Sequence, residues 1–313
     1  MTEQMLDLTI IIPNYNTKGL VRNCLASIYE HTKGITFEII CIDDNSPDGS
    51  ADMVAGEFPN VILIRNTVNQ NYVRNNNLGM KMSRARYACW LNSDTVLISN
   101  AFEALVGFMD SRPNVAACGP KLLNPDGTLQ PCIRSFPRPG TLLLQAVNWH
   151  ILVPASRSMK RLYGLDLDHT KSQRVENIGT TAFVVRRSTW EQAGMLDERF
   201  QIYLVDWVYN FMLQKKGYEV WYTPCAEIVH FGSQSVGQNV VHSIRGLHDA
   251  MILFSDEYNY FGSSAVVKLV VRLAVRARCI LKLAEHHLGS NKQLNKGPLA
   301  PSRHTVSQKT DGL

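Results

Sequence analysis

The sequence contains no uninterrupted apolar run long enough to cross a membrane. Its longest apolar stretch, residues 262–284, is broken by five lysines and arginines. The first residues, MTEQMLDLTIIIP, show neither the basic leader nor the cleavage-site pattern of a secretory signal. We therefore expect a cytoplasmic chain.

Cysteine pairs with CxxC spacing are also absent, although the chain has seven cysteines. Their odd number and scattered positions, several of them inside apolar runs, do not match a zinc or redox motif. We expect reduced thiols that serve as small core side chains.

A net positive charge is present only in the C-terminal part of the chain. From Gly262 onward there are nine Lys or Arg residues and two acids, which give a net charge of +7. Because the whole chain has a net charge of +5, the residues before Gly262 carry a net charge of −2. The 313 residues, 45% of them hydrophobic, can build one large domain with appendages or two modest domains.

The first part of the chain alternates apolar β-rich runs with segments of helical spacing. The predicted strands are residues 8–12, 37–42, 61–65, 87–91 and 115–123, and the predicted helices are residues 18–31, 49–58, 73–84 and 101–110. Strands that are apolar along their whole length are covered on both faces. We therefore expect an α/β fold with a Rossmann-like, mostly parallel central sheet and helices on both faces.

Polar segments follow four of these runs: PNYN at 13–16, DDNSPDGS at 43–50, NTVNQNYVRNNN at 66–77 and NSD at 92–94. Each segment alone is equally typical of an ordinary turn. In a parallel sheet, however, the carboxyl ends of the strands meet at one edge, where ligands bind. Together the four segments predict a site for a polar small molecule.

The C-terminal half contains a predicted strand, TTAFVVRR, and a helix, STWEQAG, with Ser188 as N-cap and Gly194 closing it. A helix from residue 206 to 216 and a strand, YEVWYTP, follow. Residues 124–175 are less regular and are typical of a lid or substrate loop.

Six motifs in order carry a family resemblance: IIIPNYN, EIICIDDNSPDGS, NQNYVRNNNLG, WLNSDTVL, AGMLDERFQIYLVD and PCAEIVHFGSQS. Over about residues 7–235 the chain resembles the family-two glycosyltransferases of the GT-A fold, and most of all the bacterial rhamnosyltransferase-like enzymes of surface polysaccharide synthesis. The resemblance implies a catalytic domain at 1–235, with a nucleotide-binding half at about 1–123 and an acceptor half at about 124–235. C-terminal helices at 236–288 and a tail at 289–313, expected to be disordered, complete the chain.

The resemblance implies an inverting transfer of a sugar, with rhamnose as a candidate, from a dTDP- or UDP-linked donor. Asp43 matches the acid that accepts the imide N–H of the base, and Tyr15 matches a residue beside the base; the alternative for Tyr15 is an aromatic that closes a turn. The expected nucleotide-binding residues are Pro13, Tyr15, Asn16, Asp43, Asn45, Asn69, Arg74 and Asn92.

Asp94 matches the last acid of the family's DxD-like motif, which binds Mg²⁺ or Mn²⁺. Asn92 stands where the first acid would be, so we expect the cation to arrive largely with the donor. His230 resembles a family histidine near the diphosphate. It is a metal ligand, a phosphate donor or simply a hydrogen-bonded residue at the end of a strand.

Asp206, in YLVDWVYNF, matches the catalytic general base, although the two acids that usually accompany it are replaced by Val205 and Val208. Apolar neighbours raise the pKa of a carboxylate, whereas a helix start lowers it, and the sequence does not decide between them. Asp206 can also be the N-cap of its helix. Donor or acceptor sugar is expected to contact Gly179, Thr180 and Thr181.

The basic C-terminal segment predicts an amphipathic helix. Its cations fall within an arc of about 160° on a helical wheel; they are Lys268, Arg272, Arg276, Arg278 and Lys282. This helix either lies on an anionic membrane at residues 262–284, as a lipid-linked acceptor would require, or packs its apolar face on the catalytic domain. No aromatic interleaving accompanies the charge, so nucleic acid is not an expected partner.

Two other functions fit the sequence less well. A sugar nucleotidyltransferase needs a glycine-rich, basic triphosphate loop after its first strand, and IIIPNYNTKG is poor in both. A nucleotide-sugar-binding protein without activity is suggested by the missing acids beside Asp206.

Overall fold

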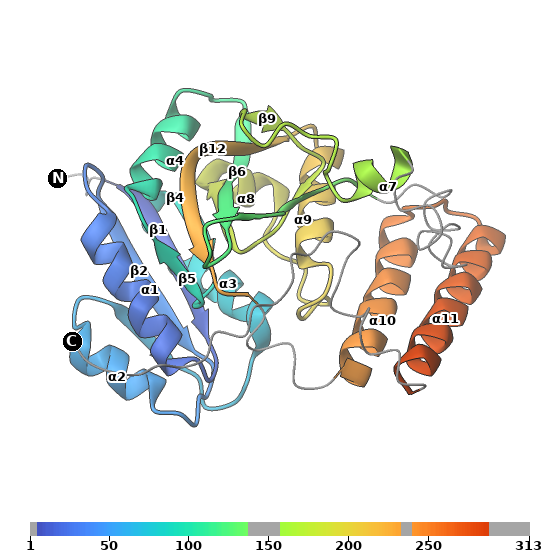
Figure 1. Cartoon of the computed structure of the whole chain (residues 1–313), viewed down its shortest axis with the longest axis horizontal. Helices are drawn as coiled ribbons and strands as arrows, with labels where there is room; N and C mark the ends of the chain where they lie inside the picture. The colour runs from blue at the N-terminus through green and yellow to red at the C-terminus, as the bar shows by residue number, and fades with distance from the viewer. Residues whose placement is uncertain (1–4, 137–156, 233–239, 288–313) are drawn as a thin grey trace.

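The computed structural model describes residues 5–136, 157–232 and 240–287, and a ten-stranded sheet lies at its centre (Figure 1). The main path of this sheet has the order β3-β2-β1-β4-β11-β6-β12-β5; β7 and β9 pair with β6 and β12, and β8 pairs with β10 in a second sheet. The strands are β1 (Leu6–Asn14), β2 (Phe37–Asp43), β3 (Ile62–Arg65), β4 (Ala85–Leu91), β5 (Thr95–Leu97), β6 (Val115–Leu123), β7 (Leu129–Gln130), β8 (Ile133–Arg134), β9 (Gln173–Arg174), β10 (Asn177–Ile178), β11 (Ala182–Arg186) and β12 (Glu219–His230).

Helices lie on both faces of the sheet (Figure 1). They are α1 (Lys18–His31), α2 (Ser50–Glu57), α3 (Asn71–Met82), α4 (Ala101–Asp110), α7 (Arg157–Leu162), α8 (Arg187–Ala193), α9 (Val205–Lys215), α10 (Val240–Tyr258) and α11 (Ala265–His287). α1 and α4 contact β5, β6 and β12, whereas α3 and α8 contact β1, β2, β4 and β11.

Four of the seven neighbouring pairs along the main path of the sheet run parallel, which confirms the predicted α/β architecture. β3, β2, β1 and β4 are parallel, and so are β6 and β12. β11 runs antiparallel between β4 and β6, and β5 runs antiparallel to β12, two reversals that the sequence pattern did not reveal. The register Asn14↔Asp43↔Arg65 brings the carboxyl ends of β1, β2 and β3 to one edge, as expected.

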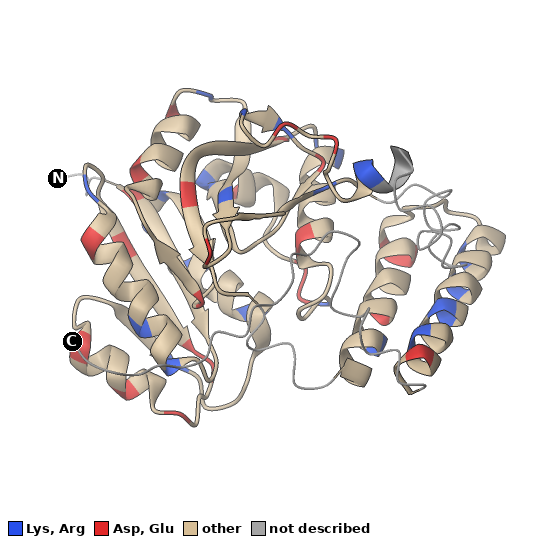
Figure 2. Cartoon of the chain, viewed as in Figure 1, with Lys and Arg blue, Asp and Glu red and all other residues tan. Residues whose placement is uncertain are grey.

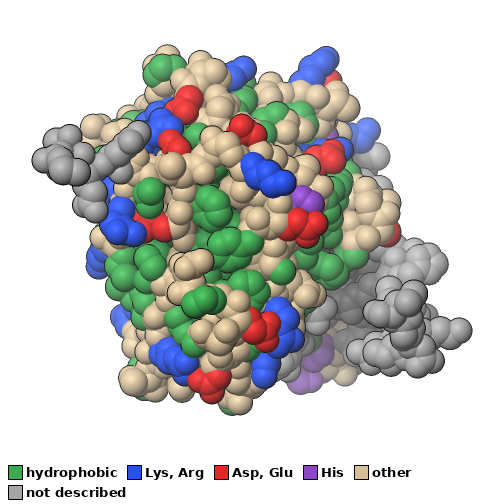
Figure 3. All heavy atoms as spheres, turned by 90° about the vertical axis from the view of Figure 1, so that its left-hand side faces the viewer, with side chains coloured by type: hydrophobic (Ala, Val, Ile, Leu, Met, Phe, Trp, Pro, Cys, Tyr) green, Lys and Arg blue, Asp and Glu red, His purple; other side chains and the backbone are tan. Residues whose placement is uncertain are grey.

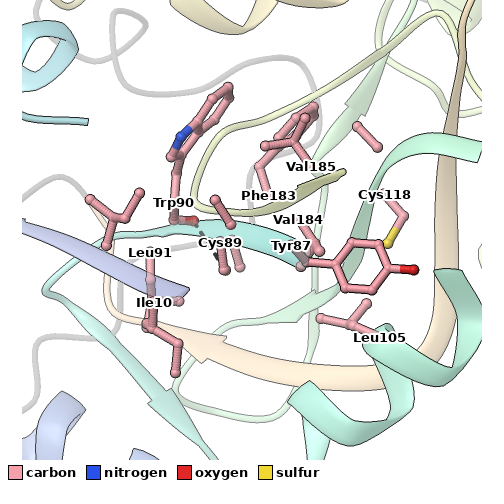
Figure 4. Packing of buried hydrophobic residues seen from close by; sticks show 14 of the residues in the cluster. Ile10, Tyr87, Cys89, Trp90, Leu91, Leu105, Cys118, Phe183, Val184 and Val185 are labelled. Atoms are coloured by element: carbon pink, nitrogen blue, oxygen red, sulfur yellow. Dashed lines mark hydrogen bonds between the residues drawn. The ribbon is translucent and has the colours of Figure 1, made fainter. Parts of the chain in front are cut away.

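An aromatic cluster in the core joins the sheet to α9. The Trp90 and Phe183 rings stack with centroids 4.9 Å apart, and Tyr209 of α9 meets Trp90 edge-on at 4.9 Å. Figure 4 shows Trp90 and Phe183 among the buried residues of β4 and β11. Because such pairs favour one relative orientation of their rings, this cluster fixes α9 relative to the sheet.

All seven cysteines are free thiols, and six of them are buried, which confirms their predicted role as core side chains. Burial raises the pKa of Cys24 to about 12, so this thiol stays protonated at neutral pH.

Two predicted helix starts are wrong. α8 begins at Arg187 with Arg186 as its N-cap, so Ser188 lies inside the first turn, although Gly194 ends the helix as predicted, with φ +97°. α9 begins at Val205 after Leu204, whose φ of +59° is left-handed, so Asp206 is not the N-cap.

α10 packs against α9 and against the loop before it. Phe254 of α10 meets Phe211 of α9 with ring centroids 5.3 Å apart. A Cβ atom at Gly246 would lie 2.5 Å from Tyr203 Cε2, so only glycine allows this approach of the loop. Asp197, in the same loop, accepts a hydrogen bond from Tyr258 at 2.8 Å.

The basic face of α11 is directed toward α10, and Figure 2 shows the basic residues of α11 beside the acidic residues of α10. Arg272 pairs with Asp256 at 2.8 Å and Arg276 with Asp249 at 2.7 Å. The expectation that the apolar face of this helix packs on the catalytic domain is therefore wrong, because these ion pairs turn that face outward. None of the helices in the described ranges is long and apolar enough to span a membrane; the tail at 289–313 lies outside those ranges.

Gly79 of α3 lies directly against Ile11 of β1 and gives a test of this packing. A Cβ atom there would lie under 3.0 Å from two carbons of the fully buried Ile11. Gly79→Ala should therefore lower the free energy of unfolding by about 1–3 kcal/mol in urea titrations. Gly107→Ala is the control, because the exposed glycine in α4 has nothing within 4 Å of its added Cβ, and there stability should rise by up to about 1 kcal/mol. Equal effects in the two variants would contradict the packing.

Candidate active site

Polar side chains gather at the carboxyl ends of β1 and β2. Asp43 is 4% exposed; its Oδ1 accepts from Asn14 Nδ2 at 2.9 Å, and its Oδ2 accepts from the Ser46 backbone N–H at 3.0 Å. Each carboxylate oxygen has a second lone pair, so Asp43 can still accept one more donor. Asn14, which holds this carboxylate, was missed because it looks like an ordinary turn residue.

Asp44 was also missed, and it organises the start of α3. Its carboxylate accepts from the backbone N–H groups of Gln70 at 2.7 Å and Asn71 at 3.0 Å, and from the side chain of Asn66. An acid at this position satisfies N–H groups that a helix start leaves free. It therefore fixes the loop that carries Asn69 and the first turn of α3, which carries Arg74.

Three asparagines at this edge have left-handed backbones: Asn16 with φ +55°, Asn45 with φ +66° and Asn71 with φ +72°. Asparagine tolerates this region better than most residues. Tyr15 stands beside Asn16 with 48% of its surface exposed, and Asn45 is exposed as well. These side chains are therefore free to meet a ligand, while Pro13 stays partly buried in β1.

Arg74 and Asn69 are held by their own neighbours. Arg74 Nε lies 3.4 Å from Glu198, and its guanidinium also donates to Gln70. Asn69 Oδ1 accepts from the Asn71 N–H at 3.2 Å. Asn69 lies on the loop before α3, next to the N–H groups that Asp44 binds, and Arg74 lies in the first turn of α3.

The segment from Gly179 to Thr181 lies directly against the end of β4. The Asn92 N–H donates to Thr181 O at 2.9 Å, and Tyr72 OH donates to Thr180 O at 3.0 Å. Gly179 N–H donates to Cys132 O at 2.9 Å. The structure thus brings the predicted sugar-pocket residues beside the predicted nucleotide residue Asn92.

Asp94 and His230 form a close pair, since His230 Nε2 lies 3.2 Å from Asp94 Oδ1 and each side chain is 13% exposed. Gln130, which the sequence did not suggest, contacts His230 Nδ1 through Oε1 at 2.6 Å. Gln130 Nε2 donates to Asn124 Oδ1 and to His230 O, so the orientation of the amide is fixed.

This network determines which nitrogen of His230 carries the proton. Because Gln130 presents its oxygen, Nδ1 is the donor, and the neutral ring leaves a bare lone pair on Nε2. Nε2 is buried and makes no hydrogen bond of good geometry. Nε2 and the Asp94 carboxylate oxygen, 3.2 Å apart, therefore offer two ligand atoms to one cation.

Asp206 lies in the first turn of α9, partly buried. Burial raises its pKa above the ordinary range, and this effect exceeds the opposing effects of the hydrogen bond from Asn177 and the positive charge of Arg134. The sequence left the direction of the shift open. A carboxylate with a raised pKa is a stronger base when it is ionised.

Asn177 and Asn210 hold Asp206 in place, and the sequence suggested neither. Asn177 Nδ2 donates to Asp206 Oδ2 at 3.1 Å, and Asn210 Nδ2 donates to Asn177 Oδ1 at 2.8 Å. Arg134, which is exposed, pairs with Asn177 in the register of β8 and β10.

A short segment connects the two groups of acids. Asn177 binds Asp206, and four residues later Thr181 binds Asn92, which is two residues before Asp94. Four residues of chain span at most about 14 Å. This segment therefore links the surroundings of Asp206 to the end of β4, two residues before Asp94.

Residues 9–188 match the family model described as Glycosyl transferase family 2. The N-acetylglucosaminyl-diphospho-decaprenol L-rhamnosyltransferase of Mycobacterium tuberculosis is 24% identical over 262 residues, 79% of this chain and 83% of that protein. The O-antigen biosynthesis protein RfbC of Myxococcus xanthus is 26% identical over 231 residues, 72% of this chain and 17% of that protein.

Two solved structures share the fold. GalNAc-T7 with UDP, GalNAc and Mn²⁺ superposes with a TM-score of 0.59 at 15% identity, over 92% of this chain and 58% of that one. The mannosyltransferase PcManGT of Pyrobaculum calidifontis with GDP-Man and Mn²⁺ gives 0.54 at 14% identity, over 91% of this chain and 76% of that one. The expected GT-A fold is confirmed.

The raised pKa of Asp206 gives a test that needs no ligand. Folding raises this pKa, so the ionised carboxylate lowers stability at neutral pH, and the loss disappears as the pH falls and the group takes up a proton. Asp206→Asn should therefore raise the Tm at pH 8 by about 2–4 °C, and the difference should shrink toward acidic pH. A variant less stable than the wild type at pH 8 would contradict the raised pKa.

Proposed function

We propose that this chain, which belongs to glycosyl transferase family 2 and is a glycosyltransferase, transfers a sugar with inversion from a nucleotide diphosphate donor. The acceptor is a saccharide or lipid-linked saccharide in surface polysaccharide synthesis. The name of the Mycobacterium tuberculosis relative supports rhamnose as the sugar and a lipid-linked sugar as the acceptor. The observation that carries the proposal is Asp206, a carboxylate of raised pKa held beside the 179–181 segment.

In the proposed reaction Asp206 is the general base. The acceptor hydroxyl attacks the anomeric carbon and loses its proton to Asp206, while the bond from that carbon to the phosphate oxygen breaks and the nucleoside diphosphate leaves. Asn177 orients the carboxylate, and the partial burial of Asp206 keeps its charge poorly solvated until a proton arrives. The backbone of Gly179, Thr180 and Thr181 would line the space for the reacting sugar.

The edge formed by β1 and β2 would bind the nucleotide. Asp43 has a lone pair left for the imide N–H of uracil or thymine, which favours UDP or dTDP. Tyr15 is exposed beside it and offers a ring for the base to stack on. Asn16, Asn45, Asn69, Arg74 and Asn92 supply further polar groups for ribose and phosphates.

Asp94 and His230 would hold Mg²⁺ or Mn²⁺. Adjacent ligands of an octahedral ion bound at about 2.1 Å stand about 3 Å apart, which fits the 3.2 Å between Asp94 Oδ1 and His230 Nε2. The described residues contain no metal-binding group of three or more His, Cys, Asp or Glu, so donor phosphates would complete the coordination. A cation there would neutralise charge that develops on the diphosphate.

A lipid-linked acceptor implies a location at the inner face of the cell membrane, with the protein peripheral to it.

The substitution Asp206→Asn tests the proposed catalytic role of Asp206. A thermal-shift screen of UDP-, dTDP- and GDP-sugars with Mn²⁺ first identifies the donor. With that donor, the rate of sugar transfer by the variant should fall about 10²–10⁴-fold, because no base remains to take the proton of the acceptor hydroxyl. Donor binding should persist, because the substitution leaves Asp43 and Tyr15 intact.

Asp166→Asn is the matched control, since Asp166 is an exposed aspartate after α7. Its rate should equal that of the wild type. Equal rates in Asp206→Asn and wild type would remove Asp206 as the base. Nucleotide-sugar binding without any transfer or hydrolysis by the wild type would favour a binding protein instead.

Gln130→Leu tests the metal site. The substitution removes the oxygen that accepts a hydrogen bond from His230 Nδ1, so the ring proton is no longer held on Nδ1 and Nε2 is less available to a metal ion. The Mn²⁺ affinity, measured by EPR titration in the presence of UDP or dTDP, should therefore fall about 10–100-fold. Gln192→Leu, at a glutamine of α8 that binds Tyr218, should leave the affinity unchanged. Unchanged affinity in Gln130→Leu would contradict the proposed role of His230 as a ligand.

A further inference from the structure

The most exposed large hydrophobic residues in the described part of the chain gather on α11. Val266, Leu269, Val270, Leu273 and Ile280 have between 56% and 71% of their surface exposed, and Leu281 has 46%. At 100° per residue these six side chains fall within an arc of about 120°. They form one continuous apolar face along the helix, which we call the outer face.

The opposite side of α11 explains why this face is turned outward. Val275 and Cys279 are its buried residues and lie against α10. Around them polar contacts bind the two helices together: Lys268 donates to Asp256 O at 2.7 Å, and Arg278 Nη1 lies 2.9 Å from His248 Nε2. With the ion pairs of Arg272 and Arg276, these contacts fix the rotation of α11 about its axis.

Positive charge borders the outer face. Arg272 and Arg276 lie at one border, and 54% and 59% of their side chains remain exposed although both are paired. Beyond α11, the sequence of residues 288–313 adds four Lys or Arg residues and one acid. An apolar stripe with cations at its margin matches the headgroup region of an anionic bilayer, where the apolar side chains enter and the cations stay at the phosphates.

Two further observations favour a lipid surface over a protein partner. α11 contains no Phe, Tyr or Trp, whereas cores of protein interfaces are enriched in aromatic residues. Its 23 residues extend for about 35 Å at 1.5 Å per residue, and in Figure 1 the helix occupies one outer end of the molecule, with α10 between it and α9. In Figure 3, which views the opposite end, hydrophobic side chains are interspersed with charged ones.

We propose that α11 lies in the surface of an anionic membrane with its outer face in the acyl region, so that the apolar residues rather than the paired cations anchor the protein. This inference rests on the proposed function in one respect: a lipid-linked acceptor explains why the enzyme would bind a membrane. Membrane binding by α11 does not depend on which sugar is transferred.

The experiment compares the full chain with a triple variant, Leu269→Gln, Leu273→Gln and Ile280→Gln. These side chains are exposed and glutamine favours helices, so the Tm should stay near that of the wild type. Binding is measured by cosedimentation with vesicles of equal parts phosphatidylcholine and phosphatidylglycerol, and with phosphatidylcholine alone. The wild type should bind the anionic vesicles, and the triple variant should bind about tenfold or more weakly.

A second triple variant, Val68→Gln, Met82→Gln and Ile98→Gln, removes exposed apolar residues elsewhere and should bind vesicles like the wild type. Equal vesicle binding by the α11 variant and wild type, or no binding by the wild type, would overturn the proposal. So would a wild-type dimer in lipid-free solution that the α11 variant converts to a monomer. Transfer to a water-soluble acceptor is assayed separately, so a failure of the proposed enzymatic function is distinguishable from a failure of the anchor.

Discussion

The hydrogen bond from Asn177 to Asp206 is the contact on which the candidate active site depends. Asn210, one turn after Asp206 on α9, occupies the oxygen of Asn177, so the Asn177 amide can only point its N–H₂ group at the carboxylate. From Asn177 the chain runs directly through Gly179 and Thr180 to Thr181, which binds Asn92. One backbone segment therefore sets the position of the acid on α9 relative to the end of β4.

The rest of the fold supports this arrangement. The stacked rings of Trp90 and Phe183 join β4 to β11, and Tyr209 of α9 packs edge-on against both rings. Asp206 is thus on a helix that this aromatic cluster joins to the sheet, while its carboxylate remains poorly solvated. The ionised group is unfavourable for stability and favourable for taking a proton, so stability and reactivity oppose each other at this residue.

The sequence predicted the parts of the fold that follow from local patterns. Fully apolar strands and polar turns behind them indicated the parallel sheet and its binding edge, because both signals are contained in a few adjacent residues. Asn177, Arg134 and Gln130 lie on strands of two residues, which are too short to show a period. Their roles depend on partners 29 to 100 residues away, so no local signal could reveal them.

The orientation of α11 shows the same limit. Its amphipathic pattern correctly divided the helix into a basic and an apolar face, but a helical wheel does not say which face meets the protein. That choice depends on Asp249 and Asp256, which belong to another helix. The two acids, together with the other contacts between α10 and α11, hold the basic face inward, against the usual expectation that an apolar face turns inward.

The contact between Gly246 and Tyr203 has a consequence for building chimeric enzymes. The ring of Tyr203 occupies the space of a side chain on α10, and Asp197 and Arg199 of the same loop bind Tyr258 and Glu257, so the loop before Asp206 and α10 depend on each other for their packing. A recombination point placed between residues 197 and 258 would combine a loop and an α10 from different proteins and would disrupt these contacts. The loop, α9, β12 and α10 would therefore have to be exchanged together.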